Sequence, residues 1–278
     1  MTDVPNIPLN DGTTIPQLGF GVFQVPEDET HKAVSAALQA GYRHIDTAKV
    51  YGNEEGVGRA IADSGIPHDE LYVTTKLWNA DQGFDTALKA FESSLGRLGL
   101  EKMDLYLIHW PVPAKDEWVN SWKALEKLQA DGRVTSIGVS NFTIPFLERL
   151  FAETTVRPVL NQVELHPSFA QSELRAFHAD HDIRTEAWSP LGGQGGSVLD
   201  KPELAAIGAV HGKTPAQVVI RWHLQLGNVV IPKSATPARI EANIDVFDFE
   251  LSGDEMATIA TLDDGSRVGP DPAVANFE

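Results

Sequence analysis

Short apolar runs alternate with amphipathic stretches along most of the chain, up to Phe249. The apolar runs have the length and composition of buried strands. They begin near Leu18, Tyr42, Leu71, Asp104, Val134, Pro158, Arg184 and Asn228. The stretches between them have helical spacing, over 29–40, 54–64, 84–96, 118–130, 144–154, 172–180, 215–226 and 237–245. Eight alternating units of this kind predict an α/β (β/α)₈ TIM barrel.

A doubly wound sheet is the alternative arrangement of alternating strands and helices. That fold requires a glycine fingerprint in its first turn, and here Gln24 stands where the third glycine after Gly19 and Gly21 is needed. Asp11-Gly12 between two short extended stretches predicts an N-terminal β-hairpin cap. Residues 252–262 read as an extra C-terminal helix, and residues 263–278 as an irregular tail. We therefore expect one barrel domain over residues 1–278.

The charge and the residue composition exclude several classes of binding partner and of metal site. The chain of 278 residues carries 22 Lys and Arg against 39 Asp and Glu, a net charge of −17, so nucleic acid and anionic membranes are not expected partners. No cysteine is present, which excludes disulfides and thiolate metal sites. The His178 and His181 pair is a poor metal candidate, and no metal site is expected. Without a leader or an apolar span, we expect a cytoplasmic protein, and we expect it to be a monomer.

Polar side chains follow three consecutive strands near the N-terminus, at the end where barrel active sites lie. Asp46 and Tyr51 follow the first, Lys76 ends the second and His109 ends the third. A nearby ammonium lowers the pKa of a phenol, so Lys76, held in place by Asp46, would make Tyr51 a general acid toward an oxygen. His109 would donate a second hydrogen bond to that oxygen. A buried Asp–Lys pair is also a common structural ion pair, so the prediction depends on the four residues together.

No side chain of this set can give hydride, so a cofactor is required. Ser140-Asn141, Gln162 and Trp188 occupy further strand ends and offer amide groups and a flat aromatic face, as a nicotinamide requires. Lys233 and Ser234 precede a helix that Thr236-Pro237 opens, and Arg239 follows one turn later. A helix N-terminus with adjacent cations favours a phosphate.

With these residues assembled, the chain resembles the aldo-keto reductases, and among them the bacterial branch that includes 2,5-diketo-D-gluconate reductases. The resemblance runs from Ile15 to Leu262 and is carried by the stretches GYRHIDTAKVYGNEEGVG, VTTKLW, DLYLIHWP, SIGVSNF, NQVELHP and IPKSATPARIEANIDVFDFEL. It implies NADPH-dependent reduction of a small aldehyde or ketone, such as a keto sugar or keto acid, with a catalytic tetrad of Asp46, Tyr51, Lys76 and His109.

The resemblance also implies the cofactor contacts. Ser140, Asn141 and Gln162 would hold the carboxamide, and Trp188 would stack on the ring. Ser189, Leu191 and Gly192 would follow the pyrophosphate, and Lys233, Ser234, Arg239 and Asn243 would hold the adenosine end. Lys233 and Arg239 would favour NADPH over NADH. One departure bears on cofactor affinity: the family commonly has Glu immediately before the last Asn, and here that position is Ala242.

Phe23, Val50, Trp78 and Trp110 correspond to substrate-pocket positions and predict an aromatic-walled site. Lys49 beside them is read as a solvent-exposed residue or as a group that attracts an anionic substrate, and the Gly-rich segment 192–201 as a surface loop or a lid. Two rival functions stay open. One is a barrel that binds a nucleotide in a sensor or regulatory role with little turnover, and the other is an aldolase with Lys76 as its Schiff-base amine.

Overall fold

Eight parallel strands form the centre of the molecule. The computed structural model describes residues 4–193 and 197–277, and within them the sheet order is β10-β9-β8-β7-β6-β5-β4-β3. Most of these strands are buried along their whole length, as expected where helices cover one face and the barrel interior the other. The strands are β3 (Phe20–Gly21), β4 (His44–Asp46), β5 (Tyr72–Leu77), β6 (Met103–Ile108), β7 (Val134–Ser140), β8 (Leu160–Glu164), β9 (Arg184–Trp188) and β10 (Val229–Val230).

The two edges of the sheet meet, which makes it a closed barrel. Leu18 and Val230 form a parallel bridge. Gly19 N donates to Val230 O at 2.9 Å, and Val230 N donates to Gln17 O at 3.0 Å. The predicted barrel is therefore confirmed, and the doubly wound alternative is wrong.

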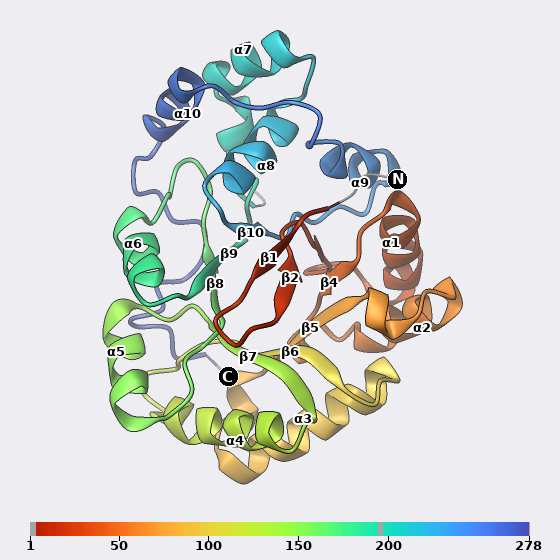
Figure 1. Cartoon of the computed structure of the whole chain (residues 1–278), viewed down its shortest axis with the longest axis vertical. Coiled ribbons are helices and arrows are strands. Elements are labelled where there is room, and N and C mark those ends of the chain that lie inside the picture. The colour runs from red at the N-terminus through yellow and green to blue at the C-terminus, as the bar shows by residue number, and fades with distance from the viewer. Residues whose placement is uncertain (1–3, 194–196, 278) are drawn as a thin grey trace.

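Helices surround the strands (Figure 1). Several begin as the sequence predicts, for example α8, which starts at Pro215 and whose first turn is held by a reciprocal capping box between Thr214 and Gln217. No helix in the part of the chain that the structure describes is long and apolar enough to cross a membrane. The helices are α1 (Glu27–Ala40), α2 (Glu54–Ser64), α3 (Phe84–Leu98), α4 (Trp118–Ala130), α5 (Ile144–Glu153), α6 (Ser172–Asp180), α7 (Pro202–His211), α8 (Pro215–Gln225), α9 (Pro237–Ile244) and α10 (Gly253–Ala260).

The N-terminal hairpin of β1 (Asn6–Pro8) and β2 (Thr14–Pro16) lies across one end of the barrel (Figure 1). Asn10 Nδ2 donates to Pro158 O at 2.9 Å and Arg184 Nε to Pro8 O at 2.8 Å, next to the starts of β8 and β9. The hairpin thus closes the N-terminal ends of the strands. The C-terminal ends of the strands are left uncovered by the hairpin, and the candidate active site lies there.

Helix α7 and segment 192–201 add to the prediction from sequence. Helix α7 was not expected, whereas α10 corresponds to the extra C-terminal helix expected over 252–262. Segment 192–201 contains a short 3₁₀ turn, η4 (Val198–Asp200), in which Val198 is buried. Residues 194–196 lie outside the described residues, so the choice between loop and lid stays a prediction.

Candidate active site

A buried ion pair lies at the C-terminal ends of β4 and β5. Lys76 Nζ donates to Asp46 Oδ1 at 2.7 Å, to Asp46 Oδ2 at 2.8 Å and to Thr47 O at 2.9 Å. These bonds use all three ammonium protons. Burial lowers the pKa of Lys76, but Asp46 and Tyr51 outweigh it, so the pKa is raised and Lys76 stays charged.

Tyr51 and His109 lie beside this pair. Tyr51 ends a 3₁₀ turn, η1 (Lys49–Tyr51), and its ring centroid is 5.2 Å from Lys76 Nζ. His109 directly follows β6, and its ring meets the Tyr51 ring edge-on at a centroid distance of 5.7 Å. The structure therefore brings together the four residues that the sequence analysis singled out. Their chemical roles stay predictions.

The expected net lowering of the Tyr51 pKa is wrong for this structure. Burial is the largest influence and raises the pKa of Tyr51 to about 12, although the charge of Lys76 acts in the opposite direction. Desolvation of the phenolate thus outweighs one neighbouring ammonium that Asp46 already neutralises in part. The phenol stays protonated at neutral pH, which a proton donor requires.

His109 is neutral. Burial first, and then the charge of Lys76, hold the pKa of its imidazole well below the usual range. Its Nδ1 is buried and has no hydrogen-bond partner among residues 4–193 and 197–277. A neutral imidazole beside the Tyr51 ring can donate one hydrogen bond without adding charge.

The amide side chains from β7 and β8 adjoin the ion pair. Gln162 Nε2 donates to Asp46 Oδ2 and to Glu186 Oε2, each at 2.8 Å. Both amide protons are used, so Gln162 presents its Oε1 as an acceptor. Ser140 Oγ donates to Gln162 O at 2.8 Å and accepts from Asn141 Nδ2 at 3.1 Å.

Trp188 at the end of β9 joins the same group. Its Nε1 donates to Asn141 Oδ1 at 2.9 Å, and Asn141 itself has a left-handed backbone with φ of 64°. Ser189 is also left-handed, with φ of 47°, and its carbonyl accepts from Gly192 N at 2.9 Å with Leu191 between them. The chain turns sharply at both residues. Non-glycine residues with a left-handed backbone are uncommon and cluster at binding and active sites.

The predicted adenosine contacts lie in the loop after β10 and on α9. Ser234 Oγ accepts from Thr236 N at 3.1 Å, which orders the entry to the helix. Lys233 is half-buried and Arg239 exposed, and neither forms a salt bridge within the described ranges. Asn243 is buried. Two cations without acidic partners, in a chain of net charge −17, fit a phosphate.

The predicted pocket residues form an apolar rim. Phe23 and Val50 are exposed, and the Phe23 ring lies 5.1 Å from that of Tyr51. Trp78 contacts the His109 ring edge-on at 5.3 Å, and the buried Trp110 lies 6.5 Å from the Trp188 ring. This geometry leaves an aromatic wall around the four polar residues.

The C-terminal tail completes this wall. Phe277 lies 5.1 Å from the Trp110 ring and 6.0 Å from the Trp78 ring. Its carbonyl accepts from Asn79 Nδ2 at 2.8 Å. These contacts place the tail at the site.

Lys49 is partly exposed and carries an acidic partner. Its ammonium pairs with Asp81 on the 3₁₀ turn η3 (Asn79–Asp81). Its charge is therefore partly neutralised within the rim, and an attraction of Lys49 for an anionic substrate stays a prediction.

Two buried carboxyl groups were missed from the sequence. Glu186 on β9 contacts Gln162, and Glu164 on β8 accepts from Val268 N at 2.5 Å and Gly269 N at 2.9 Å in the tail. Each stands in a short, otherwise strand-like run, RTEAW and LNQVE, where a Glu is costly to bury. A Glu in a buried strand was therefore the sequence signal that could have identified both residues.

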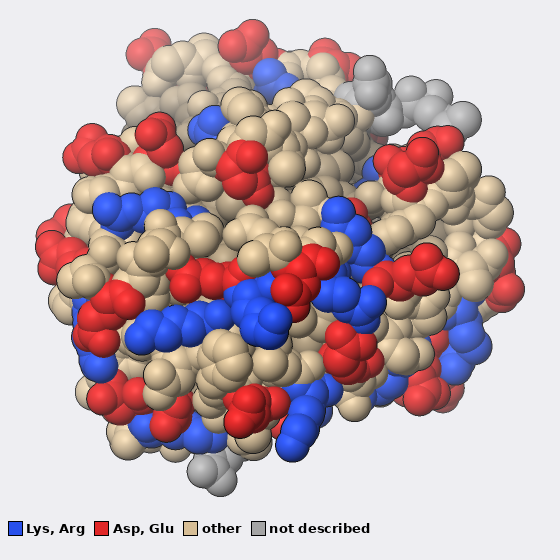
Figure 2. All heavy atoms as spheres, turned by 60° about the horizontal axis from the view of Figure 1, so that its bottom comes forward, with Lys and Arg blue, Asp and Glu red and all other residues tan. Residues whose placement is uncertain are grey.

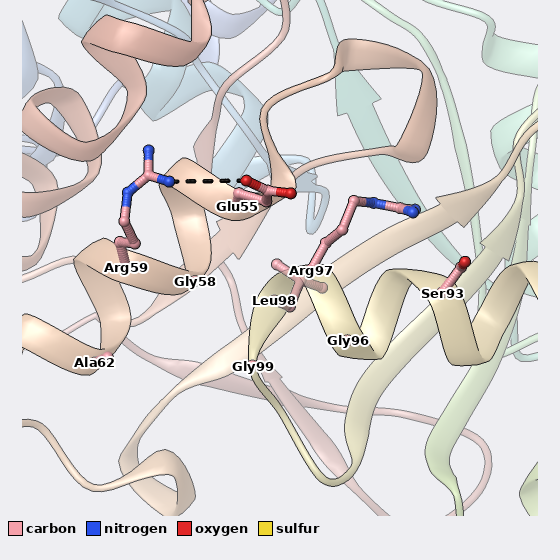
Figure 3. A pocket seen from close by; sticks show the side chains of 9 residues that line it. All are labelled: Glu55, Gly58, Arg59, Ala62, Ser93, Gly96, Arg97, Leu98 and Gly99. Carbon is pink, nitrogen blue, oxygen red and sulfur yellow. Dashed lines mark ion pairs between the residues drawn. The ribbon is translucent and has the colours of Figure 1, made fainter.

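A hollow of about 670 Å³ lies away from these residues, on the outside of the barrel between α2 and α3 (Figure 3). Its two arginines are already paired, Arg59 with Glu27 and Glu55, and Arg97 with the buried Glu54. The hollow therefore has no free cation for an anionic ligand, and it is not part of the candidate active site.

Figure 2 shows one face of the molecule, on which acidic and basic side chains are intermixed and no broad basic field is present. Within the residues described, no group of three or more His, Cys, Asp or Glu side chains is arranged to hold a metal ion. His178 is buried, and its ring nitrogens contact Asn161 and Thr185.

The chain is similar over nearly its whole length to named reductases and to a solved structure. An "Aldo-keto reductase" of Mycobacterium sp. (strain KMS) is 57% identical over 273 residues, 98% of each chain. The "Methylglyoxal reductase DkgA" of Escherichia coli (strain K12) is 52% identical over 266 residues, 96% of each chain. The crystal structure of a Gox0644 variant in complex with NADPH superimposes with a TM-score of 0.94 at 50% identity and covers 99% of this chain and all of that chain. The model of the Aldo/keto reductase family matches residues 17–264, and the chain belongs to that family.

Proposed function

We propose that the chain reduces a small aldehyde or ketone with NADPH, and that Tyr51 protonates the carbonyl oxygen. The observation that carries this proposal is the buried Asp46–Lys76 pair beside Tyr51 and His109, at the open end of the barrel. A stability role alone does not require a phenol and an imidazole at the same rim.

Each of the four residues has a part in this chemistry. Tyr51 keeps its proton because of burial, and Lys76 stabilises the negative charge that the phenol gains as it donates. Asp46 orients Lys76 through two hydrogen bonds. Neutral His109 donates a hydrogen bond to the same substrate oxygen.

The residues present fit NADPH. The acceptor Oε1 of Gln162, fixed by two carboxyl partners, suits the N–H groups of a carboxamide. Trp188 offers an aromatic face, and Lys233 with Arg239 offers unpaired cations for the additional phosphate that distinguishes NADPH from NADH. When bound, NADPH supplies the hydride. Ala242 leaves a methyl group where the family commonly has Glu, so the adenine contact is weaker.

We propose a small 2-oxoaldehyde, keto acid or keto sugar as substrate. The name of the 52% identical relative, methylglyoxal reductase, supports the first of these. The rim of Phe23, Trp78, Trp110 and Phe277 is apolar, and Lys49 is already paired with Asp81. Of these three classes, the neutral 2-oxoaldehyde and keto sugar therefore fit better than the anionic keto acid. A cytoplasmic monomer is part of this proposal, and light scattering of the purified chain tests the oligomeric state.

The rival functions have less support. A Schiff-base amine must be unprotonated to attack, and the raised pKa of Lys76 keeps it charged. A purely regulatory barrel has no use for a proton donor beside a buried ammonium. Absence of turnover with every carbonyl compound tested would favour the regulatory function.

The test is Tyr51→Phe, with NADPH oxidation followed against methylglyoxal, keto acids and keto sugars. General acid catalysis is worth about 100- to 10,000-fold, so kcat should fall by that factor while the Kd for NADPH stays nearly unchanged. Tyr106→Phe is the matched control, because the buried Tyr106 hydroxyl has no hydrogen-bond partner in the described chain and the Tyr106 ring packs edge-on against Phe91. Equal kcat for wild type and Tyr51→Phe contradicts the proposal.

A further inference from the structure

Glu186 is a fully buried carboxyl group in the barrel interior, and it lies one side chain behind the site. In register it faces Gln162 on β8 and Val229 on β10. Its Oε2 accepts from Gln162 Nε2 at 2.8 Å, and its Oε1 has no hydrogen-bond partner in the described part of the chain. The nearest cationic candidate is His44 Nε2, at 3.8 Å from Oε1.

The charges around Glu186 do not neutralise a carboxylate there. Asp46 on β4 already takes two protons of Lys76, and the third goes to Thr47 O. His44 on β4 contacts Thr74 Oγ1 at 3.1 Å, and burial, with the charge of Lys76, lowers its pKa to about 3, so it is neutral.

Tyr72 on β5 and Tyr51 after β4 are the other titratable groups whose charge would act on Glu186. Burial raises the pKa of Tyr72 well above the usual value and that of Tyr51 to about 12, so both are neutral. Two carboxyl groups thus share one ammonium and one amide. Burial, and then the charge of Asp46, raise the pKa of Glu186 to about 8. At neutral pH the interior therefore holds one carboxylate, one ammonium and one carboxylic acid.

Gln162 connects this carboxylic acid to the cofactor site. Its amide donates to Asp46 and to Glu186, so its orientation depends on both carboxyl groups. If Gln162 holds the carboxamide, as the proposed function has it, ionisation of Glu186 adds one negative charge directly behind the nicotinamide. That charge favours the oxidised cofactor, whose ring is positive, over the reduced cofactor, whose ring is neutral.

We propose that Glu186 is a positioning residue that couples proton release to the redox state of the bound nicotinamide. As a neutral acid it holds Gln162 in place for reduced cofactor. When oxidised cofactor binds, the positive ring favours the carboxylate, and the proton of Glu186 passes to solvent. No electron or other bond changes in this step.

The test is to count the protons released when NADP⁺ and NADPH bind, by calorimetry near pH 7.5 in buffers of different ionisation enthalpy. Protons that belong to the phosphates of the cofactor cancel in the difference between the two ligands. We expect the wild type to release more protons with NADP⁺ than with NADPH, Glu186→Gln to abolish that difference, and Tyr51→Phe to retain it. If Glu186→Gln keeps the difference, or Tyr51→Phe abolishes it, the proposal is overturned.

A second measurement needs no variant. The ratio of the Kd for NADP⁺ to the Kd for NADPH, from quenching of tryptophan fluorescence, is followed from pH 6 to pH 9. If the positive ring lowers the pKa of Glu186 by about one unit, NADP⁺ binding tightens up to about tenfold relative to NADPH across that range. A flat ratio overturns the proposal. Both measurements use binding alone, so wild-type chain that shows the linkage but reduces no carbonyl would refute only the proposed function.

Discussion

Replacement of Glu164 by Gln is expected to release the C-terminal tail from the barrel. The Glu164 carboxylate accepts from Val268 N at 2.5 Å, from Gly269 N at 2.9 Å and from His166 Nε2 at 3.1 Å. In Gln, an NH₂ group replaces one of the two carboxylate oxygens. The donor that now bonds to that oxygen would then face another donor. At least one charge-assisted hydrogen bond is lost, about 2 kcal/mol, and this raises the open population of the tail about 30-fold.

The release should be local. Val268 is 45% exposed and the tail has no helix or strand, so it can open while the barrel remains folded. Hydrogen exchange at the amides of Val268 and Gly269 is expected to become about 30-fold faster, with little change in Tm. The KM for carbonyl substrates should rise, because Phe277 leaves the aromatic wall. Glu148→Gln, on an exposed face of α5, is the control. Unchanged exchange in Glu164→Gln would refute this account of the tail.

Acid should open the tail in the wild type for the same reason. Burial alone raises the pKa of Glu164, but the hydrogen bonds from His166, Val268 and Gly269 outweigh it and the net pKa is lowered. A carboxyl group whose pKa is lower in the folded state contributes its stability above its unfolded pKa of about 4.3 and loses it as pH falls through the folded value. Exchange in the tail should therefore accelerate below about pH 4 and stay constant between pH 6 and 8.

Two further substitutions test the cofactor side. A Cβ at Gly269 would clash with Cη2 of Trp188, so Gly269→Ala must displace the Trp188 ring or the tail at a cost of about 1–3 kcal/mol. The Kd for NADPH should therefore rise. Gly253→Ala, where nothing lies close to the added Cβ, is the control and should leave that Kd unchanged. Lys233→Ala should weaken NADPH about tenfold and leave NADH nearly unaffected, as titration of tryptophan fluorescence with each cofactor will show. Equal losses for the two cofactors would contradict the phosphate assignment.

The sequence predicts the barrel and the four polar residues because both depend on local pattern. Strand and helix periods repeat eight times, and Lys76 and His109 each interrupt an apolar strand at the same end. Helix α7 was missed because its sequence, PELAAIGAVH, has apolar residues on every side and no polar face. Its Leu204 is buried while its Val210 is 77% exposed, a distribution that only the packed structure defines.

The pKa of Tyr51 and the part played by Glu186 depend on three-dimensional packing. Which of two opposing influences on a phenol is larger, a nearby ammonium or desolvation, is decided by how closely the barrel surrounds it. Glu186 comes from β9 and contacts a side chain of β8 that itself reaches β4. Contacts across a barrel interior have no fixed spacing in sequence, so the residues could be seen singly but not as a network.

The buried Asp46–Lys76 pair is expected to make the fold less stable than apolar side chains would at the same positions. We infer that it is retained because activity requires it. Asp46→Asn removes the carboxylate that pairs directly with the buried ammonium, so the free energy of unfolding should fall by about 3–5 kcal/mol. Asp46→Leu combined with Lys76→Met removes both charges, and apolar replacements of buried pairs are often neutral or stabilising. The double variant should therefore be more stable in urea than Asp46→Asn, although it reduces no carbonyl. If the double variant is instead the less stable of the two, the pair belongs to the folding core, and the argument that it is retained for chemistry loses its basis.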